Sequence, residues 1–371
     1  MHKLTTAVFS VAALSASVFL PVRAAPPRLE PKRASWFSSI KACRDLAYGP
    51  RQVGAGAVHR DVAQTYDLYL PAPLGKIPKT APFFLYVHGG AWMYGSKDWP
   101  GSFFESFAKE GFVVASMNYA LCNKSRGGEH TFADMLADID AMVSHLPQLA
   151  AALGIDIDRI ALGGSSAGGH LALLYAYDGA KPSALGLDLA HAVPVACVFS
   201  DCGPTDLASP EFGVAGMGAT KNEFSRWNQN FGALSGAGRD YGTLTNLVSH
   251  LARYSPVNLV CAESPPTICL YGVVGTVPTA DTFAPEPGGE RRPYADLWKM
   301  VGSAESPPVA VGTDGIVATQ SYEALTNRLA ASGVPYAARI ERAGHCQILS
   351  RKPKTRSWLF ENMKGHLERK R

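Results

Sequence analysis

The sequence predicts an α/β fold in which a mostly parallel central sheet is covered by helices on both faces. Short apolar runs with the length and the β-branched or aromatic content of buried parallel strands recur along the chain, at 83–88, 112–119, 160–164, 195–200 and 267–272. Helical periodicity marks the segments 132–153 and 167–177 between them. Strands that alternate with helices favour this architecture, whose active sites lie beyond the carboxyl ends of the strands.

The composition indicates one elaborated domain. The chain has 371 residues, of which 47% are hydrophobic and 18% charged, so it can bury one large core, and we expect this domain over 51–371. Two segments, 206–256 and 273–305, interrupt the alternation with Gly-, Asn- or Pro-containing sequence. Because both follow predicted strands, they are candidate cap or rim insertions over a pocket, and plain surface elaboration is the alternative.

The N-terminus has the pattern of an export signal. Residues 1–24 combine a basic start, an apolar stretch too short for a comfortable membrane span and a small-residue cleavage pattern. We therefore expect a signal peptide cleaved near Ala24, a secreted or periplasmic protein, and a proline-rich linker over 25–50. Cleavage removes Lys3 and Arg23, which leaves 33 of the 35 basic residues against 31 acidic ones. This charge favours no nucleic-acid or membrane partner.

The spacing of the cysteines, histidines and aspartates predicts neither a metal site nor a cofactor. Seven cysteines occur, none in a C-x-x-C spacing, so zinc and redox motifs are not indicated. Their odd number leaves at least one unpaired in an oxidising compartment. His130, Asp134 and Asp138 could together hold a metal ion, but a solvated helix face that also includes Asp140 is favoured.

A run of small residues predicts a nucleophilic serine. The stretch LGGSSAGGH, residues 162–170, follows a predicted strand and opens a predicted helix. Ser166 fits the G-x-S-x-G pattern through Gly164 and Gly168, whereas Ser165 would need a glycine where Ala167 stands. A sharp strand-to-helix turn holds such a serine in strained backbone geometry and leaves no room for bulk around it. The alternative is a flexible glycine loop.

The stretch VHGGAWMYGSKDW, residues 87–99, supplies candidate oxyanion donors. Two glycines directly after a strand let backbone N–H groups approach an oxyanion with no Cβ in the way. We assign Gly89 and Gly90 as donors, together with the N–H of Ala167. His88 is expected to brace this loop, and Trp92 either braces it or walls a pocket.

Two further segments supply a base and an acid. A serine hydroxyl needs a histidine base, and the base needs a carboxylate that holds its tautomer. His345 lies in a Gly-containing turn after a predicted short strand, and Asp314 precedes it across a helix-like stretch. The order Ser, Asp, His is that of the α/β-hydrolases. His170, in the helix behind Ser166, is expected to serve core packing.

These segments resemble the α/β-hydrolase esterases of the hormone-sensitive-lipase-like group, over residues 60–367. The resemblance lies in YVHGGAW, NYAL, GIDIDRIALGGSSAGGHLALL, GPTDL, YSPVNL and AGH, and the nearest branch contains feruloyl-esterase-like, kynurenine-formamidase-like and prenylcysteine-methylesterase-like proteins. It implies the α/β-hydrolase fold, the triad of Ser166, Asp314 and His345, and the His-Gly-Gly oxyanion loop.

Two departures from this family pattern concern the acid. The family's acid follows its strand almost at once, whereas some forty residues separate TICLYG, residues 267–272, from Asp314. Either an insertion follows TICLYG, or the run PPVAV before Asp314 is itself the acid's strand, so Asp281 is retained as a second candidate acid. In addition, the family usually has a histidine at the end of the strand before the acid, and Tyr271 stands in its place here.

These residues predict a hydrolase of small or aromatic carboxylic esters that works through an acyl-enzyme and needs no cofactor. The same machinery would also suit a formamidase or amidase. A catalytically silent binding protein of the same fold is the alternative from another class, since a fold does not determine function.

Overall fold

The computed structural model describes residues 41–51, 63–98, 101–123, 128–181, 184–209, 221–278, 310–314, 316–317 and 319–368. Within these residues, an eight-stranded sheet has the order β1-β2-β4-β3-β7-β8-β9-β12. Its strands are β1 (Lys41–Ala47), β2 (Thr65–Leu70), β3 (Phe83–Val87), β4 (Val113–Met117), β7 (Ile160–Ser165), β8 (Val195–Asp201), β9 (Thr267–Gly272) and β12 (Tyr336–Glu341). Strand β2 pairs antiparallel with both β1 and β4, and the other five pairings are parallel, which confirms the predicted fold class.

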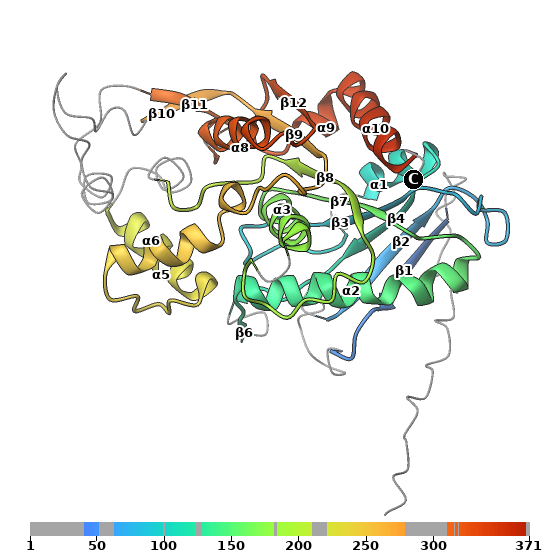
Figure 1. Ribbon diagram of the computed structural model, residues 1–371, viewed down its shortest axis with the longest axis horizontal. Helices are drawn as coiled ribbons and strands as arrows, with labels where there is room; N and C mark the ends of the chain where they lie inside the picture. The colour runs from blue at the N-terminus through green and yellow to red at the C-terminus, as the bar shows by residue number, and fades with distance from the viewer. Residues whose placement is uncertain are drawn as a thin grey trace, which may run out of the picture.

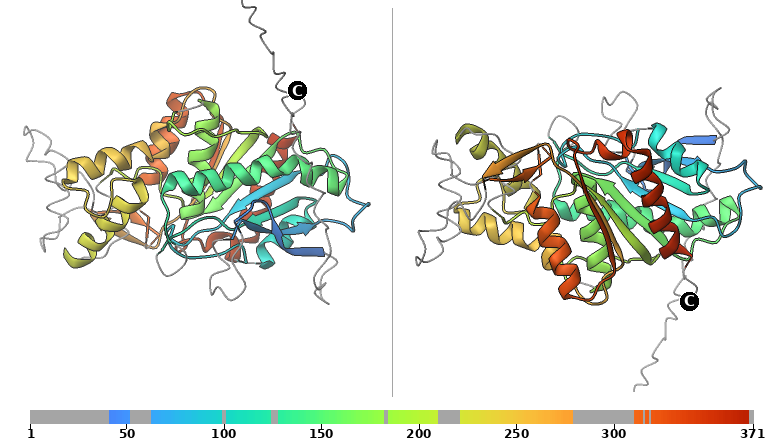
Figure 2. Two further views of the ribbon diagram at one scale, coloured as in Figure 1. Left: turned by 90° about the horizontal axis from the view of Figure 1, so that it is seen from below. Right: turned by 90° about the horizontal axis from the view of Figure 1, so that it is seen from above.

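Helices cover both faces of this sheet (Figures 1 and 2). Helices α2 (Phe132–Leu153), α3 (Ala167–Ala180) and α8 (Gln320–Ala331) share one apolar core with the sheet, and α1 (Gly101–Lys109), α9 (Ile348–Arg351) and α10 (Pro353–Leu367) share another. Successive side chains of a strand point alternately into the two cores. Leu85 of β3 lies in the first core, and Phe84 lies in the second. Strands apolar on both faces read as continuous apolar runs, and for that reason they were recognisable in the sequence.

Helix α2 has the bounds that the sequence predicts, because both of its ends carry clear signals. Thr131 and Asp134 form a capping box, in which the Asp134 carboxylate accepts from the Thr131 N–H at 2.8 Å. Gly154 ends the helix at φ 69°. None of the described helices is both long and apolar enough to cross a bilayer.

The N-terminal boundary requires a correction. Residues 41–47 lie in the segment 25–50 that was expected to be a linker, but they form edge strand β1 against β2. Among the described side chains of β1 only Cys43 and Leu46 are buried, so this edge strand lacks the continuous apolar run by which the inner strands are recognisable. The expected signal peptide, residues 1–24, lies outside the described residues.

The expected solvated face of α2 is wrong for Asp138 and Asp140, whereas Asp134 is exposed as expected. Asp138 is only 3% exposed, forms an ion pair with Arg51 and accepts from the N–H of Ala120 at 2.7 Å. Asp140 accepts the hydroxyl of Tyr175 at 2.7 Å. These carboxylates therefore join α2 to neighbouring segments, and His130 and Asp134 form no metal-binding group with them.

The two interrupting segments have different structures. Within 206–256, helices α5 (Lys221–Ser235) and α6 (Leu244–Arg253) pack on each other and project at one end of the molecule (Figure 2, yellow). A short 3₁₀ helix, η3 (Pro256–Asn258), follows them. In the second segment, β10 (Gly275–Pro278) pairs antiparallel with β11 (Ala310–Thr313) outside the main sheet, and residues 279–309 lie outside the described part of the chain. Another small pair joins β5 (Cys122–Asn123) to β6 (Gly128–Glu129).

Candidate active site

Ser166 occupies the sharp turn between β7 and α3. Its backbone has φ 54° and ψ −122°, a strained region for a residue with a Cβ. A Cβ on Gly164 or Gly168 would collide with the carbonyl oxygen of Val87, so the turn tolerates only glycine at both positions. The N–H of Ser166 donates to the carbonyl oxygen of Asp201 at 2.7 Å, which fixes the turn against β8.

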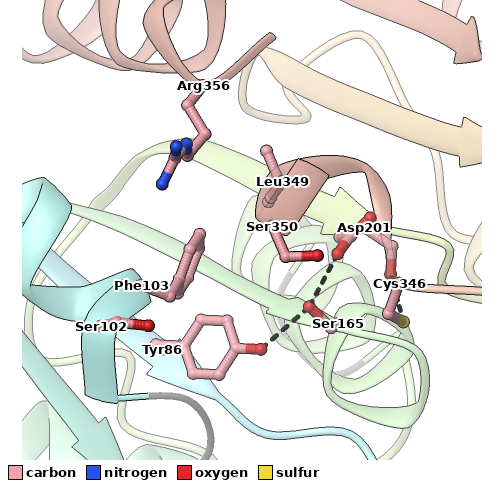
Figure 3. Close-up of a pocket in the computed structure, with 9 residues that line it drawn as sticks. All are labelled: Tyr86, Ser102, Phe103, Ser165, Asp201, Cys346, Leu349, Ser350 and Arg356. Carbon is pink, nitrogen blue, oxygen red and sulfur yellow. Dashed lines mark hydrogen bonds between the residues drawn. The ribbon is translucent and has the colours of Figure 1, made fainter. Parts of the chain in front are cut away.

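Ser165 has a different environment from its neighbour. Its hydroxyl accepts from Tyr86 at 2.9 Å and donates to the carboxylate of Asp201 at 3.0 Å (Figure 3). These groups border a cavity of about 140 Å³ on the side of the sheet that α1, α9 and α10 cover. Burial raises the pKa of Asp201 to about 6. Ser165 therefore belongs to a polar network behind the turn, which no sequence motif indicated.

The predicted oxyanion loop lies directly against Ser166. A Cβ on Gly89 would lie 2.8 Å from the carbonyl oxygen of Ser165 and 3.2 Å from the Cβ of Ser166. Gly90 has φ 121°, which a residue with a side chain rarely adopts. His88 braces the loop as expected: its Nδ1 donates to the carbonyl oxygen of Gly89 at 2.7 Å, and its ring stacks on Tyr119.

This contact gives a prediction for Gly89→Ala. The added methyl would force the loop away from Ser166, so we expect kcat for an ester to fall by roughly 10²-fold with little change in KM, as for the loss of an oxyanion donor. Steady-state kinetics would measure both constants. Gly365→Ala in α10 is the matched control, because a Cβ there meets no atom within 4 Å. Equal kinetics for the two variants would contradict the assignment of Gly89.

Asp314 and His345 meet at the same edge of the sheet. His345 Nδ1 lies 2.7 Å from Asp314 Oδ2, and the backbone N–H of His345 donates to the carbonyl oxygen of Asp314 at 3.0 Å. The other carboxylate oxygen accepts from the N–H groups of Ile316 and Val317, at 2.9 and 2.8 Å. Burial opposes the charge, but the bond to His345 and these amides outweigh it and hold the pKa of Asp314 below its usual range.

Asp314 lies beside the end of β9 despite its distance along the chain. A Cβ on Gly272, the last residue of β9, would lie 3.1 Å from the Cβ of Asp314. The chain leaves the sheet after β9 as β10 and returns as β11, so Asp314 lies beside the end of β9 although β11 directly precedes it in the sequence. Asp281 lies outside the described residues.

The remaining nitrogen of His345 faces the interior of the site. Nε2 is buried, and within the described residues it has no hydrogen-bond partner, Ser166 included. Such catalytic hydrogen bonds often form only with substrate bound. Burial opposes protonation of the ring, but Asp314 and the thiol of Cys202 raise the pKa of His345 above its usual value.

His170 and Trp92 pack the predicted oxyanion loop against α3, α5 and the end of α6. Trp92 Nε1 donates to His170 Nδ1 at 3.2 Å, and His170 Nε2 donates to the carbonyl oxygen of Tyr254 at 2.8 Å. Trp92 also contacts Phe231 of α5, with ring centroids 5.6 Å apart. Both residues thus have packing roles, which for His170 is the role expected from the sequence.

The burial of His170 predicts a pH-dependent stability. Burial lowers its pKa to about 3, so between pH 6.5 and 3 the unfolded chain binds a proton here that the folded chain does not. As the pH falls from 7 to 5, the wild type should lose about 2 kcal/mol of unfolding free energy more than His170→Asn does. Urea unfolding of both proteins at the two pH values would measure the difference. Equal losses would contradict a neutral, buried His170.

Comparison with solved structures shows the class of fold. Esterase B from Lactobacillus rhamnosis (HN001) superposes with a TM-score of 0.59 at 19% identity, over 89% of this chain and 87% of the esterase. A truncated carbohydrate esterase from gut microbiota gives 0.58 at 16% identity, over 88% and 96% of the two chains. The fold is thus that of the α/β-hydrolase esterases, as the sequence predicted.

Comparison with protein families identifies the group more narrowly. Residues 66–280 match the BD-FAE family, and the chain belongs to this family of hormone-sensitive-lipase-like α/β hydrolases. A probable isoprenylcysteine alpha-carbonyl methylesterase from rice is 31% identical over 137 residues, which are 37% of this chain and 28% of the rice protein. Esterase LipC of Mycobacterium tuberculosis is 30% identical over 115 residues, 31% and 27% of the two chains. The chain therefore spans less than a third of the length of these relatives.

Proposed function

We propose that this protein hydrolyses small or aromatic carboxylic esters, with Ser166 as nucleophile, His345 as base and Asp314 as acid. The observation that carries the proposal is the convergence of three parts at the carboxyl edge of the sheet. These are the strained turn at Ser166, the glycine loop packed against it at Gly89, and the 2.7 Å bond between Asp314 and His345.

The geometry supports a two-step mechanism. Ser166 Oγ attacks the ester carbonyl while His345 Nε2 accepts its proton, and the N–H groups of Gly89, Gly90 and Ala167 stabilise the oxyanion. His345 then gives the proton to the leaving alcohol, and water releases the acid from the acyl-enzyme with His345 again as base. Asp314 holds Nδ1 protonated, so that Nε2 presents its lone pair to the serine.

The comparisons support the same class of reaction. Both curated relatives and both solved structures described above are named as esterases, and the rice relative is named a methylesterase. The region of similarity to that relative covers only part of its length, so its particular substrate is not transferred to this chain.

The test combines turnover with covalent labelling. The protein is given p-nitrophenyl acetate, butyrate and longer esters, a feruloyl ester and an aryl formamide, and release of the phenol, acid or amine is measured. A fluorophosphonate that labels activated serines is then added, and fragment mass spectrometry locates the adduct. We expect ester turnover and an adduct on Ser166 rather than Ser165. Turnover of formamides alone would favour a formamidase, and absence of both turnover and labelling would overturn the proposal.

A further inference from the structure

Two cysteine thiols lie beside the base of the proposed triad. Cys202 directly follows β8, and Cys346 follows His345 in the turn before α9. Their sulfurs and a ring nitrogen of His345 all lie within 4.8 Å of one another, the one such group of potential metal ligands found among the described residues. We propose that these three residues bind a thiophilic divalent cation such as Zn²⁺, and that the bound cation blocks ester hydrolysis, a consequence that rests on the proposed function.

The spacing of the three ligand atoms is close to that of a tetrahedral site. With metal–sulfur bonds of ~2.3 Å and metal–nitrogen bonds of ~2.0 Å, ligand atoms in such a site are separated by roughly 3.5–3.8 Å. The atoms here need to approach one another by no more than roughly an ångström. Two thiolates and one imidazole also favour Zn²⁺ over Mg²⁺ or Ca²⁺, which prefer oxygen ligands.

The backbone holds both thiols in place without a metal. Cys202 has φ 56° and Cys346 has φ 53°, values that residues with side chains rarely adopt. The Cys202 thiol donates to Asp201 Oδ1 at 3.6 Å, and the Cys346 thiol donates to the carbonyl oxygen of Asp201 at 3.9 Å. Both sulfurs therefore already converge beside His345. Binding of the cation would release the two thiol protons, and any proton held on His345 Nε2, to solvent.

His345 has the arrangement of a metal-ligating histidine. Its Nδ1 is engaged with the Asp314 carboxylate, which leaves Nε2 as the nitrogen with an available lone pair. Three protein ligands leave a fourth position for water. Because the same lone pair has to accept the proton of Ser166, a bound cation and catalysis exclude each other.

The surroundings offer the cation a route. Cys346 is partly exposed and lines the cavity of about 140 Å³ that also contains Ser165 and Asp201 (Figure 3). The Asp201 carboxylate lies next to the thiols and can supply negative charge that attracts a cation.

The first experiment measures binding without reference to activity. The full chain, reduced and freed of metal, is titrated with Co²⁺, whose thiolate charge-transfer absorption reports sulfur ligands, and Zn²⁺ is then added as competitor. We expect one site, with affinity lowered at least about tenfold in Cys346→Ser and in Cys202→Ser. Cys346 is partly exposed whereas Cys202 is buried. Cys346→Ser therefore keeps the test valid should Cys202→Ser fail to fold. Cys261→Ser, distant in sequence and also partly exposed, is the matched control and should bind as the wild type.

The second experiment measures hydrolysis of p-nitrophenyl acetate during the Zn²⁺ titration, with each variant normalised to its own metal-free rate. We expect at least about tenfold inhibition with a midpoint at the measured Kd, reversal by a chelator, and a higher midpoint in both cysteine variants. Absence of the thiolate absorption, wild-type intensity and affinity in both cysteine variants, or binding without inhibition would overturn the inference. Thiolate binding in a wild type that hydrolyses no ester would instead support the metal site and overturn the proposed function.

Discussion

Ser166→Ala is expected to lower kcat/KM for p-nitrophenyl acetate by roughly 10⁴-fold or more, because no other group at the turn can form the acyl-enzyme. Steady-state kinetics on folded protein, checked by its thermal unfolding, would measure the loss. Ser166→Gly should lose activity equally but gain about 1 kcal/mol of unfolding free energy, because glycine relieves the strain at φ 54°. Activity lost with stability gained would show that the strain is retained for function.

The neighbouring serine provides the matched control for this prediction. Ser165→Ala removes hydrogen bonds to Tyr86 and Asp201, so it should cost about 1–3 kcal/mol of stability while the nucleophile remains. Its kcat/KM should fall far less than that of Ser166→Ala. A loss as large as that of Ser166→Ala would contradict the assignment of the nucleophile.

Asp314→Asn is expected to lower kcat by about 10⁴-fold, since an amide in this position favours the wrong tautomer of His345. KM should change much less, because the substrate does not contact the acid. Progress curves with the same ester over a range of concentrations would separate the two constants.

Asp281→Asn distinguishes the two candidate acids. Because His345 pairs with Asp314, this variant should retain wild-type kcat. A large loss in Asp281→Asn, together with an active Asp314→Asn, would assign the acid to Asp281 instead.

The strands and glycine motifs were predictable because their signals are local. Buried parallel strands are apolar throughout, and helix α2 carries its own capping residues, so both could be placed from a short window of sequence. The turn at Ser166 requires glycines two residues away on each side, and this pattern is also visible locally. The sequence therefore located the fold, the candidate nucleophile and the glycine loop.

The features that escaped prediction depend on contacts between distant parts of the chain. The position of Asp314 beside Gly272, at the end of β9, joins residues that lie far apart in the sequence. Cys202 and Cys346 lack any metal-binding spacing because they come from different strand ends, and no local pattern could have joined them. Asp138 was misplaced for the same reason, since its partner Arg51 lies on another segment.

The hairpin formed by β10 and β11 leads the chain away from the end of β9 and back to Asp314. The four residue pairs of this hairpin run from Gly275 opposite Thr313 to Pro278 opposite Ala310. They bring the chain back beside the end of β9. We expect a change of sequence between Pro278 and Ala310 to leave Asp314 beside His345, because the pairing of β10 with β11 and the bond between Asp314 and His345 involve other residues. For protein engineering, the open end of this hairpin, between Pro278 and Ala310, is therefore a candidate point at which a new recognition segment could be inserted.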